Sequence, residues 1–143
     1  MVKLRVLILC TGNSCRSQMA EGWVRHLLGP AVEVASAGTH PAGWVHPLAV
    51  QVMAEAGVDI SHHTSKGLNE VAGKPWDLVI TVCDGAKEEC PYLPGAKEQV
   101  HVPFPDPVLA QGTLEERLEV YRSVRDAIRE HLVAEVARRV GAT

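Results

Sequence analysis

One stretch of small and polar residues constrains this chain more than any other, the run Cys-Thr-Gly-Asn-Ser-Cys-Arg-Ser at positions 10–17. It follows an apolar run at positions 6–9 and precedes an amphipathic stretch, which predicts a strand, a tight loop and a helix in that order. A tight loop before a helix directs several backbone N–H groups to one point, where the helix dipole also favours negative charge. The expected ligand of the loop is therefore an oxyanion.

Two residues of this loop indicate that it also performs chemistry. Cys10 opens the loop, where the helix dipole and the guanidinium of Arg16 favour the nucleophilic thiolate. Arg16 closes the loop with a planar fork that fits two oxygens of a tetrahedral anion, and Ser17 can turn its hydroxyl toward the sulfur. The alternative for a lone cysteine is a buried thiol at the end of a strand, which the spacing Cys-x5-Arg-Ser disfavours. The predicted oxyanion-binding residues are Thr11, Gly12, Asn13, Ser14, Cys15, Arg16 and Ser17.

The cysteine spacing and the end of the loop argue against two other kinds of site. A nucleotide-binding P-loop ends in Gly-Lys-Ser or Gly-Lys-Thr, and no such ending is present. Common structural zinc sites pair cysteines closely in the sequence. Here Cys10 and Cys15 are five positions apart, and Cys83 and Cys90 are seven. We therefore expect neither a nucleotide nor a metal ion.

Length and composition predict one cytoplasmic domain that spans residues 1–143. The chain is long enough to bury a core, and 46% of its residues are hydrophobic and 22% charged. A net charge of −3 argues against a nucleic acid or a membrane surface as partner. Lys3 and Arg5 interrupt the first apolar run, which argues against a signal peptide. Without an export signal, the four cysteines indicate thiol chemistry rather than a secreted disulfide framework.

Four apolar runs predict the strands of a parallel sheet. Helical patterns separate the runs, and strands that alternate with helices favour an open sheet with right-handed crossovers. The predicted fold class is therefore α/β, a single three-layer domain with a four-stranded parallel sheet flanked by helices. An irregular segment at residues 38–46 could border the site. The strands are expected at residues 3–10, 31–36, 77–82 and 100–103.

Three helical patterns lie between and after these strands. The first follows the Cys-x5-Arg loop and ends at Gly29. The second opens at Pro47 and ends at Gly57, a candidate left-handed residue. The third opens at Thr113, which forms a capping box with Glu116, and is long enough to close the domain.

Residues that follow separate strands are expected to meet at one edge of the sheet. Cys10, Cys83 and Asp106 each follow a predicted strand, and sites of parallel sheets lie at these carboxyl ends. Asp106 stands between two prolines and is placed to protonate an oxygen that leaves the anion. Taken alone, Asp-Pro would indicate only a turn. His62 and His63 fall in irregular chain, where we expect their side chains in solvent.

Taken together, these motifs resemble the thioredoxin-coupled arsenate reductases, which share the fold of the low-molecular-weight protein tyrosine phosphatases. The resemblance covers nearly the whole chain. Cys-x5-Arg-Ser with a later Asp-Pro is shared by both families, whereas a pair like Cys83 and Cys90 singles out the reductases. The motifs are the residues from Cys10 to Gly22, Ser36 to Gly38, Cys83 with Cys90-Pro91, and Asp106-Pro107 followed by Ala110 to Thr113.

The resemblance implies a role in arsenic detoxification and a catalytic set of Cys10, Arg16, Cys83, Cys90 and Asp106. Cys10 would attack arsenate, Cys83 would then attack the sulfur of Cys10 as arsenite leaves, and Cys90 would pair with Cys83. Thioredoxin would reduce the resulting disulfide by exchange, with no bound cofactor. Phosphate is nearly isosteric with arsenate and is expected to compete for the loop.

Two other functions fit parts of the same pattern. In a low-molecular-weight protein tyrosine phosphatase, water instead of Cys83 would attack a phosphocysteine at Cys10, and residual activity of this kind is also expected of a reductase. An aromatic content of 4% leaves Trp44 or Tyr92 to stack on a phenol. A non-catalytic oxyanion sensor would keep the loop but has no need of three redox thiols.

The resemblance also raises the question of a potassium ion. Some reductases of this family bind potassium near the loop, with ligands that would correspond to Asn13, Glu21 and Ser36. The acidic ligand expected at positions 64–66 is Ser65 here, so the chain departs from the family pattern at that position.

Overall fold

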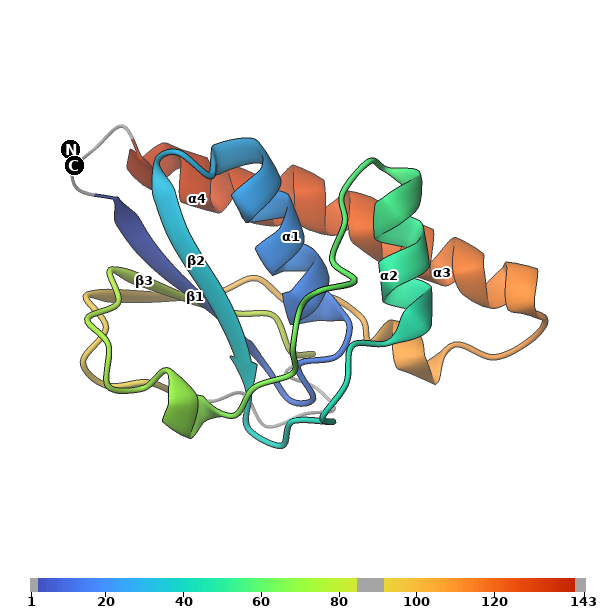
Figure 1. Cartoon of the computed structure of the whole chain (residues 1–143), viewed down its shortest axis with the longest axis horizontal. Helices are drawn as coiled ribbons and strands as arrows, with labels where there is room; N and C mark the ends of the chain where they lie inside the picture. The colour runs from blue at the N-terminus through green and yellow to red at the C-terminus, as the bar shows by residue number, and fades with distance from the viewer. Residues whose placement is uncertain (1–2, 85–91, 141–143) are drawn as a thin grey trace.

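The computed structural model describes residues 3–84 and 92–140, and within these ranges the chain folds as an α/β protein. Its strands form one parallel sheet in the order β2-β1-β3-β4 (Figure 1). The predicted class is confirmed, and the long apolar run lies inside the sheet as β1. The strands are β1 (Leu4–Cys10), β2 (Val32–Gly38), β3 (Leu78–Thr81) and β4 (Glu98–His101).

The two faces of the sheet bury different side chains, because successive strand residues point to opposite faces. Val6 and Ile8 of β1 pack on the face that carries the long helices. Leu7 and Leu9 pack on the opposite face, where Val79 of β3 joins them. The central strands are therefore dry on both sides, which explains their continuous apolar runs.

Long helices cover one face of the sheet. α1 (Arg16–Leu28) lies on it, and α2 (Pro47–Glu55) packs beside α3 (Leu114–Ala127) (Figure 1). The last helix continues through one π-helical turn, η3 (Ile128–Leu132), into α4 (Val133–Val140). No helix in the described part of the chain has both the length and the apolar character needed to span a membrane.

Shorter elements complete the described structure. η1 (Leu68–Glu70) lies on the second face, where Val71 and Trp76 fill the core and the indole of Trp76 donates to Val71 O at 2.8 Å. η2 (Pro107–Leu109) follows β4. The predicted capping box at the start of α3 is confirmed by reciprocal hydrogen bonds of 3.1 Å.

Two predicted strands differ from the structure by two residues, the second at its end and the fourth at both ends, and the other strand ends agree to within one residue. β2 extends two residues beyond Ser36, to Gly38. β4 begins at Glu98 instead of residue 100 and ends before Pro103. As an edge strand, β4 can begin with a polar residue, and proline has no N–H to donate to a ladder. Phe104 N–H still bonds to Val82 O at 3.1 Å, which keeps the chain after β4 beside the end of β3.

Candidate active site

The loop between β1 and α1 has five consecutive carbonyl groups that are all hydrogen-bonded. Four of them accept backbone N–H groups from the segment between β2 and α2, at 2.8 to 3.2 Å. The fifth, Asn13 O, accepts Gln18 Nε2 at 3.0 Å. The segment at residues 38–46 thus borders the site, as predicted. The four backbone pairs are Cys10 with Thr39, Thr11 with His40, Gly12 with Ala42, and Ser14 with His46.

The N–H groups of the loop are directed to its other side. The carbonyl and the N–H of one peptide unit point in opposite directions, so a loop whose carbonyls bond outward turns its N–H groups inward. Within the described residues, no side chain caps the first turn of α1, whose N–H groups point toward the same space. The loop therefore forms a cradle of donors at the positive end of a helix dipole, which suits an oxyanion.

Cys10 lies at the base of this cradle and is only 2% exposed. Its Sγ accepts the N–H of Asn13 at 3.2 Å and lies 2.9 Å from Ser17 Oγ. Asn13 Nδ2 donates to Ser17 Oγ at 2.8 Å, which leaves the hydroxyl hydrogen of Ser17 to point at the sulfur. The N–H of Asn13 and the hydroxyl of Ser17 thus converge on Cys10 Sγ, which fixes the position of the sulfur at the base of the cradle.

Asn13 holds the turn of the loop in place. Its φ of 49° lies in the left-handed region, which asparagine tolerates better than most residues. Its Oδ1 accepts the backbone N–H of Lys66 at 2.8 Å, and this contact fixes the orientation of the amide. Nδ2 therefore faces the hydroxyls of Ser17 and Ser36, at 2.8 and 2.9 Å.

Arg16 and Asp106 lie next to each other at this edge of the sheet. Arg16 is 3% exposed, and its NH1 donates to Phe104 O at 3.2 Å. Its NH2 lies 3.6 Å from Asp106 Oδ2. Asp106 caps η2 by accepting Val108 N–H at 3.1 Å, and its side chain is 25% exposed. A guanidinium fork and a carboxyl group with access to solvent are thus adjacent, as anion binding and proton transfer require.

The structure places Cys83 at the same sheet edge. Leu9 pairs with Thr81, and Val82 N–H donates to Leu9 O at 2.9 Å, so Cys83 follows β3 close to the level of Cys10. Cys83 is buried and is disulfide-bonded in the structure. Cys90 lies outside the described residues, and its pairing with Cys83 therefore stays a prediction.

Cys15 has the surroundings of a supporting residue. Burial raises the pKa of its thiol to about 12, and its Sγ donates to Tyr121 Oη at 3.7 Å. Tyr121 packs on the ring of His46 with centroids 5.3 Å apart, and His46 stacks on Trp44 at 5.2 Å. Burial lowers the pKa of His46, and its Nδ1 accepts the N–H of Leu48 at 3.1 Å. Cys15 is therefore a neutral thiol beside an aromatic column.

A buried carboxylate, Glu21, lies behind Asn13. Glu21 Oε1 accepts Ser36 Oγ at 2.6 Å and lies 3.9 Å from Lys66 Nζ, while Oε2 lies 2.8 Å from Arg25 NH1. Two cationic side chains already balance this carboxylate, and Asn13 Oδ1 accepts protein donors, so these residues do not fit a potassium site. Within the described ranges, no group of three His, Cys, Asp or Glu side chains could hold a metal ion.

The structure corrects the expectation for His63, whose side chain is 4% exposed rather than in solvent. Its Nδ1 lies 3.0 Å from Gln18 Oε1 and its Nε2 lies 3.1 Å from Arg25 NH1. Burial lowers the pKa of His63, which favours the neutral ring. Sequence reasoning missed this contact because 45 positions separate His63 from Gln18. The sequence does contain one indication of such a contact, because Gln18 is a polar residue in the first turn of the helix that follows the loop.

Comparison with known proteins gives the family to which this site belongs. The family model of the low molecular weight phosphotyrosine protein phosphatases matches residues 5–141. The arsenate reductase of Halalkalibacterium halodurans is 49% identical over 128 residues, which cover 90% of this chain and 91% of that protein. The similarity therefore extends over nearly the full length of both chains.

Two solved structures share the fold. An arsenate reductase in the phosphate binding state matches with a TM-score of 0.78 and 32% identity, covering 96% of this chain and 98% of that one. The thioredoxin-dependent arsenate reductase of Corynebacterium glutamicum matches with a TM-score of 0.67 and 30% identity, covering 98% of this chain and 63% of that one.

Proposed function

The chain belongs to the low molecular weight phosphotyrosine protein phosphatase family, and from this premise we propose that it reduces arsenate to arsenite with thioredoxin as electron donor. The identity to an arsenate reductase and the thioredoxin-dependent structural neighbour support this activity. The geometry around Cys10 supports the first step, and the position of Cys83 supports the second.

In the first step, arsenate occupies the cradle of N–H groups and the fork of Arg16. The thiolate of Cys10 attacks arsenic, and one arsenic–oxygen bond breaks. Asp106 protonates the departing oxygen, which leaves as water. The product is an arsenic(V) adduct on Cys10, whose negative oxygens remain bound by Arg16 and the loop.

In the second step, the thiolate of Cys83 attacks Cys10 Sγ. A sulfur–sulfur bond forms, the sulfur–arsenic bond breaks, and its electron pair goes to arsenic, which leaves as arsenite. Two thiols have then lost two electrons and arsenic has gained them. Cys90 attacks the sulfur of Cys83, which releases Cys10 as a thiolate, and thioredoxin reduces the Cys83–Cys90 disulfide by exchange.

One observation favours the reductase over the phosphatase, the position of Cys83. A phosphatase of this fold needs Cys10, Arg16 and Asp106 with a water molecule. It has no use for a buried cysteine one residue beyond Val82, which itself bonds to Leu9 next to the nucleophile. The reductase mechanism requires a second thiol at that end of β3.

The substitution Cys83→Ser tests this proposal. We expect arsenate turnover with a thioredoxin system to fall by more than roughly a hundredfold, because the hydroxyl of serine cannot form a disulfide bond with Cys10. Hydrolysis of p-nitrophenyl phosphate should change by less than about threefold, since Cys10, Arg16 and Asp106 are untouched. Both rates are measured on the same reduced preparation.

The control is Asp106→Asn, which removes the acid and should lower both activities together. A Cys83→Ser enzyme that loses both activities to the same degree would make Cys83 a structural residue. A Cys83→Ser enzyme that still turns over arsenate at the wild-type rate would show that Cys83 takes no part in the reduction and would overturn the proposed second step.

A further inference from the structure

We propose that His63 is a positioning residue of the active-site loop and acts through Gln18 on Asn13. The proposal deepens the proposed function, because it concerns the residue whose N–H donates to the nucleophile Cys10. The hydrogen bonds that support it do not depend on which oxyanion the loop binds.

Gln18 is the link between the two. Its side chain is buried, and three acceptors surround its Nε2: Asn13 O at 3.0 Å, Asn13 Oδ1 at 2.9 Å and Thr64 O at 2.9 Å. An amide oxygen in that place would face three acceptors, so the nitrogen must lie there and Oε1 must point away. The donor that Oε1 then needs is His63 Nδ1, at 3.0 Å.

The same contacts determine the tautomer of His63. Gln18 Oε1 can only accept, so Nδ1 carries the hydrogen. The guanidinium of Arg25 can only donate, so Nε2, at 3.1 Å from NH1, is the acceptor. A neutral ring with hydrogen on Nδ1 satisfies both neighbours at once. Glu21 Oε2 also lies 3.7 Å from Nε2, beyond hydrogen-bond distance, and it is paired with Arg25 NH1 at 2.8 Å.

Asn13 connects these contacts to the nucleophile, because Gln18 donates to its carbonyl oxygen and its own N–H donates to Cys10 Sγ. The other four loop carbonyls bond to backbone N–H groups, whereas Asn13 O depends on a side chain that can rotate. If Gln18 loses the donor to its oxygen, its amide is no longer held in one orientation. The backbone of Asn13, which is in the left-handed region and donates to Cys10 Sγ at 3.2 Å, then loses an anchor.

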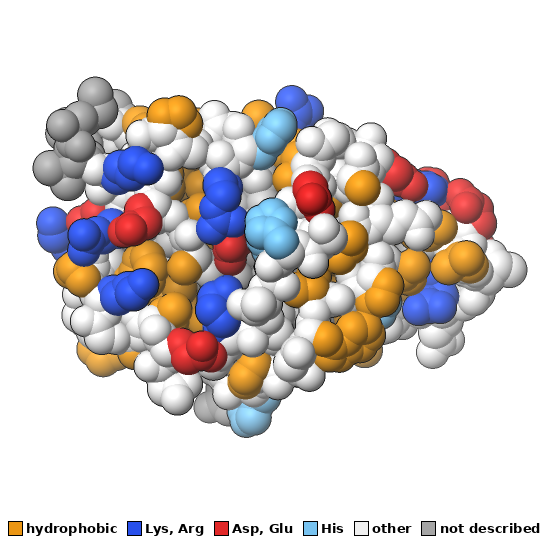
Figure 2. Space-filling model, viewed as in Figure 1, with side chains coloured by type: hydrophobic (Ala, Val, Ile, Leu, Met, Phe, Trp, Pro, Cys, Tyr) orange, Lys and Arg blue, Asp and Glu red, His pale blue; other side chains and the backbone are white. Residues whose placement is uncertain are grey.

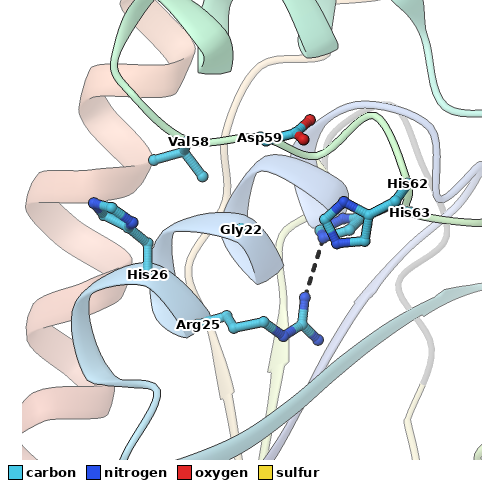
Figure 3. Close-up of a pocket in the computed structure, with 7 residues that line it drawn as sticks. All are labelled: Gly22, Arg25, His26, Val58, Asp59, His62 and His63. Carbon is cyan, nitrogen blue, oxygen red and sulfur yellow. Dashed lines mark hydrogen bonds between the residues drawn. The ribbon is translucent and has the colours of Figure 1, made fainter.

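A surface hollow lies beside His63, whose own side chain is almost fully buried. A pocket of about 150 Å³ lies beside it, and Figure 3 shows the ring of His63 facing the guanidinium of Arg25. Histidine side chains lie near the centre of the face shown in Figure 2, between basic and acidic ones. His62 touches His63 edge to face, with ring centroids 4.9 Å apart. The pocket is lined by Gly22, Arg25, His26, Val58, Asp59, His62 and His63.

Two substitutions of His63 test the roles of its two ring nitrogens separately. Asparagine can place its amide nitrogen where Nδ1 stands, and glutamine can place its terminal amide near Nε2. Only His63→Asn therefore keeps a donor to Gln18, and only His63→Gln keeps a polar group for Arg25. His62→Asn is the matched control, because His62 lines the same pocket and has no bond to Gln18.

The readout is the rate at which iodoacetamide alkylates Cys10 in the reduced protein, followed by mass spectrometry, together with kcat and KM for arsenate. We expect His63→Gln to lower the alkylation rate and kcat by roughly tenfold, because Gln18 Oε1 would be a buried acceptor without its donor. His63→Asn should restore most of the rate, and His62→Asn should match wild type. Alkylation needs neither arsenate nor thioredoxin, so it remains informative if the proposed function fails.

A double-mutant cycle distinguishes the loss of this specific contact from a general destabilisation of the protein. Gln18→Met removes the amide but keeps the length of the side chain, and in that background His63→Gln should have no further effect on alkylation. Equal losses in His63→Asn and His63→Gln, no loss in either, or additive effects with Gln18→Met would each overturn the proposal. Retention in His63→Gln with loss in His63→Asn would also overturn it, since the contact to Arg25 would then be the one that matters.

Discussion

Two thiols five positions apart have opposite surroundings. Cys10 Sγ faces the N–H of Asn13 and the hydroxyl of Ser17, and both contacts stabilise negative charge. Cys15 Sγ is buried and donates to Tyr121 Oη at 3.7 Å, and the hydroxyl of Ser14 donates to it at 3.8 Å, farther than either contact of Cys10; burial raises the pKa of this thiol. The reactivity of a cysteine therefore depends on the groups aimed at its sulfur rather than on its place in the motif.

This difference predicts selective alkylation. With a pKa of about 12, Cys15 is a thiolate in about one molecule in ten thousand at pH 8, and its reaction should rise tenfold for each pH unit. We expect iodoacetamide to modify Cys10 and spare Cys15 at pH 8, and phosphate to protect Cys10. Peptide mass spectrometry of the reduced protein measures both sites. Equal modification of the two thiols would contradict the supporting role of Cys15.

The end of β2 shapes the loop as much as the loop's own residues do. Gly38 pairs with Cys10 in the sheet, and its N–H donates to Lys66 O at 2.8 Å. A Cβ at this position would lie 2.4 Å from Thr11 O and 3.0 Å from Asn13 N. The backbone of β2 can approach the loop this closely only because glycine has no side chain.

Gly38→Ala should therefore displace the loop. We expect it to destabilise the protein by about 1–3 kcal/mol, as overpacking typically does, and to lower kcat/KM for arsenate by roughly tenfold or more. Gly73→Ala is the control, because a Cβ there meets nothing within 4 Å. Chemical denaturation and steady-state kinetics measure the two effects. Wild-type kinetics in Gly38→Ala would show that the loop tolerates a shift of β2.

In the molecule as a whole, separate parts of the chain hold the loop. The segment after β2 bonds to its carbonyls, Lys66 bonds to Asn13, and the chain after β4 brings Phe104 to Arg16. None of these contacts uses the sulfur of Cys10. The contacts that hold the loop in its binding conformation are therefore independent of the sulfur of Cys10.

From this separation we expect phosphate to stabilise the wild type and Cys10→Ser alike. At a phosphate concentration 100 times the dissociation constant, linkage gives about 2.7 kcal/mol, or roughly 5–10 °C in Tm for a chain of this size. Cys10→Ser should turn over neither arsenate nor aryl phosphate. Thermal scans with and without phosphate test the prediction, and an unchanged Tm in the serine variant would mean that the thiolate itself is needed for binding.

The sequence predicted those parts of the structure whose information is local. Residues 10–17 are consecutive and follow a strand that is buried on both faces, so the pattern alone indicated strand, loop and helix. The start of β4 was misplaced because an edge strand with Glu98 and Gln99 has no apolar run. The contact of Gln18 with His63 depends on how segments that are distant in the sequence pack together, and so does the burial of Glu21, which pairs with Arg25. Neither can be predicted from residue spacing.

The hydrogen bonds to the carbonyls of residues 10–14 affect how such a protein can evolve or be redesigned. Because backbone groups create the cradle, most side-chain substitutions around it leave the affinity for a tetrahedral anion in place. A descendant that lost its cysteines would still be a receptor for phosphate or arsenate, ready to be coupled to a fluorophore or to a partner. The chemistry depends on a few cysteine side chains, whereas the recognition depends on the backbone path of the loop together with the guanidinium of Arg16.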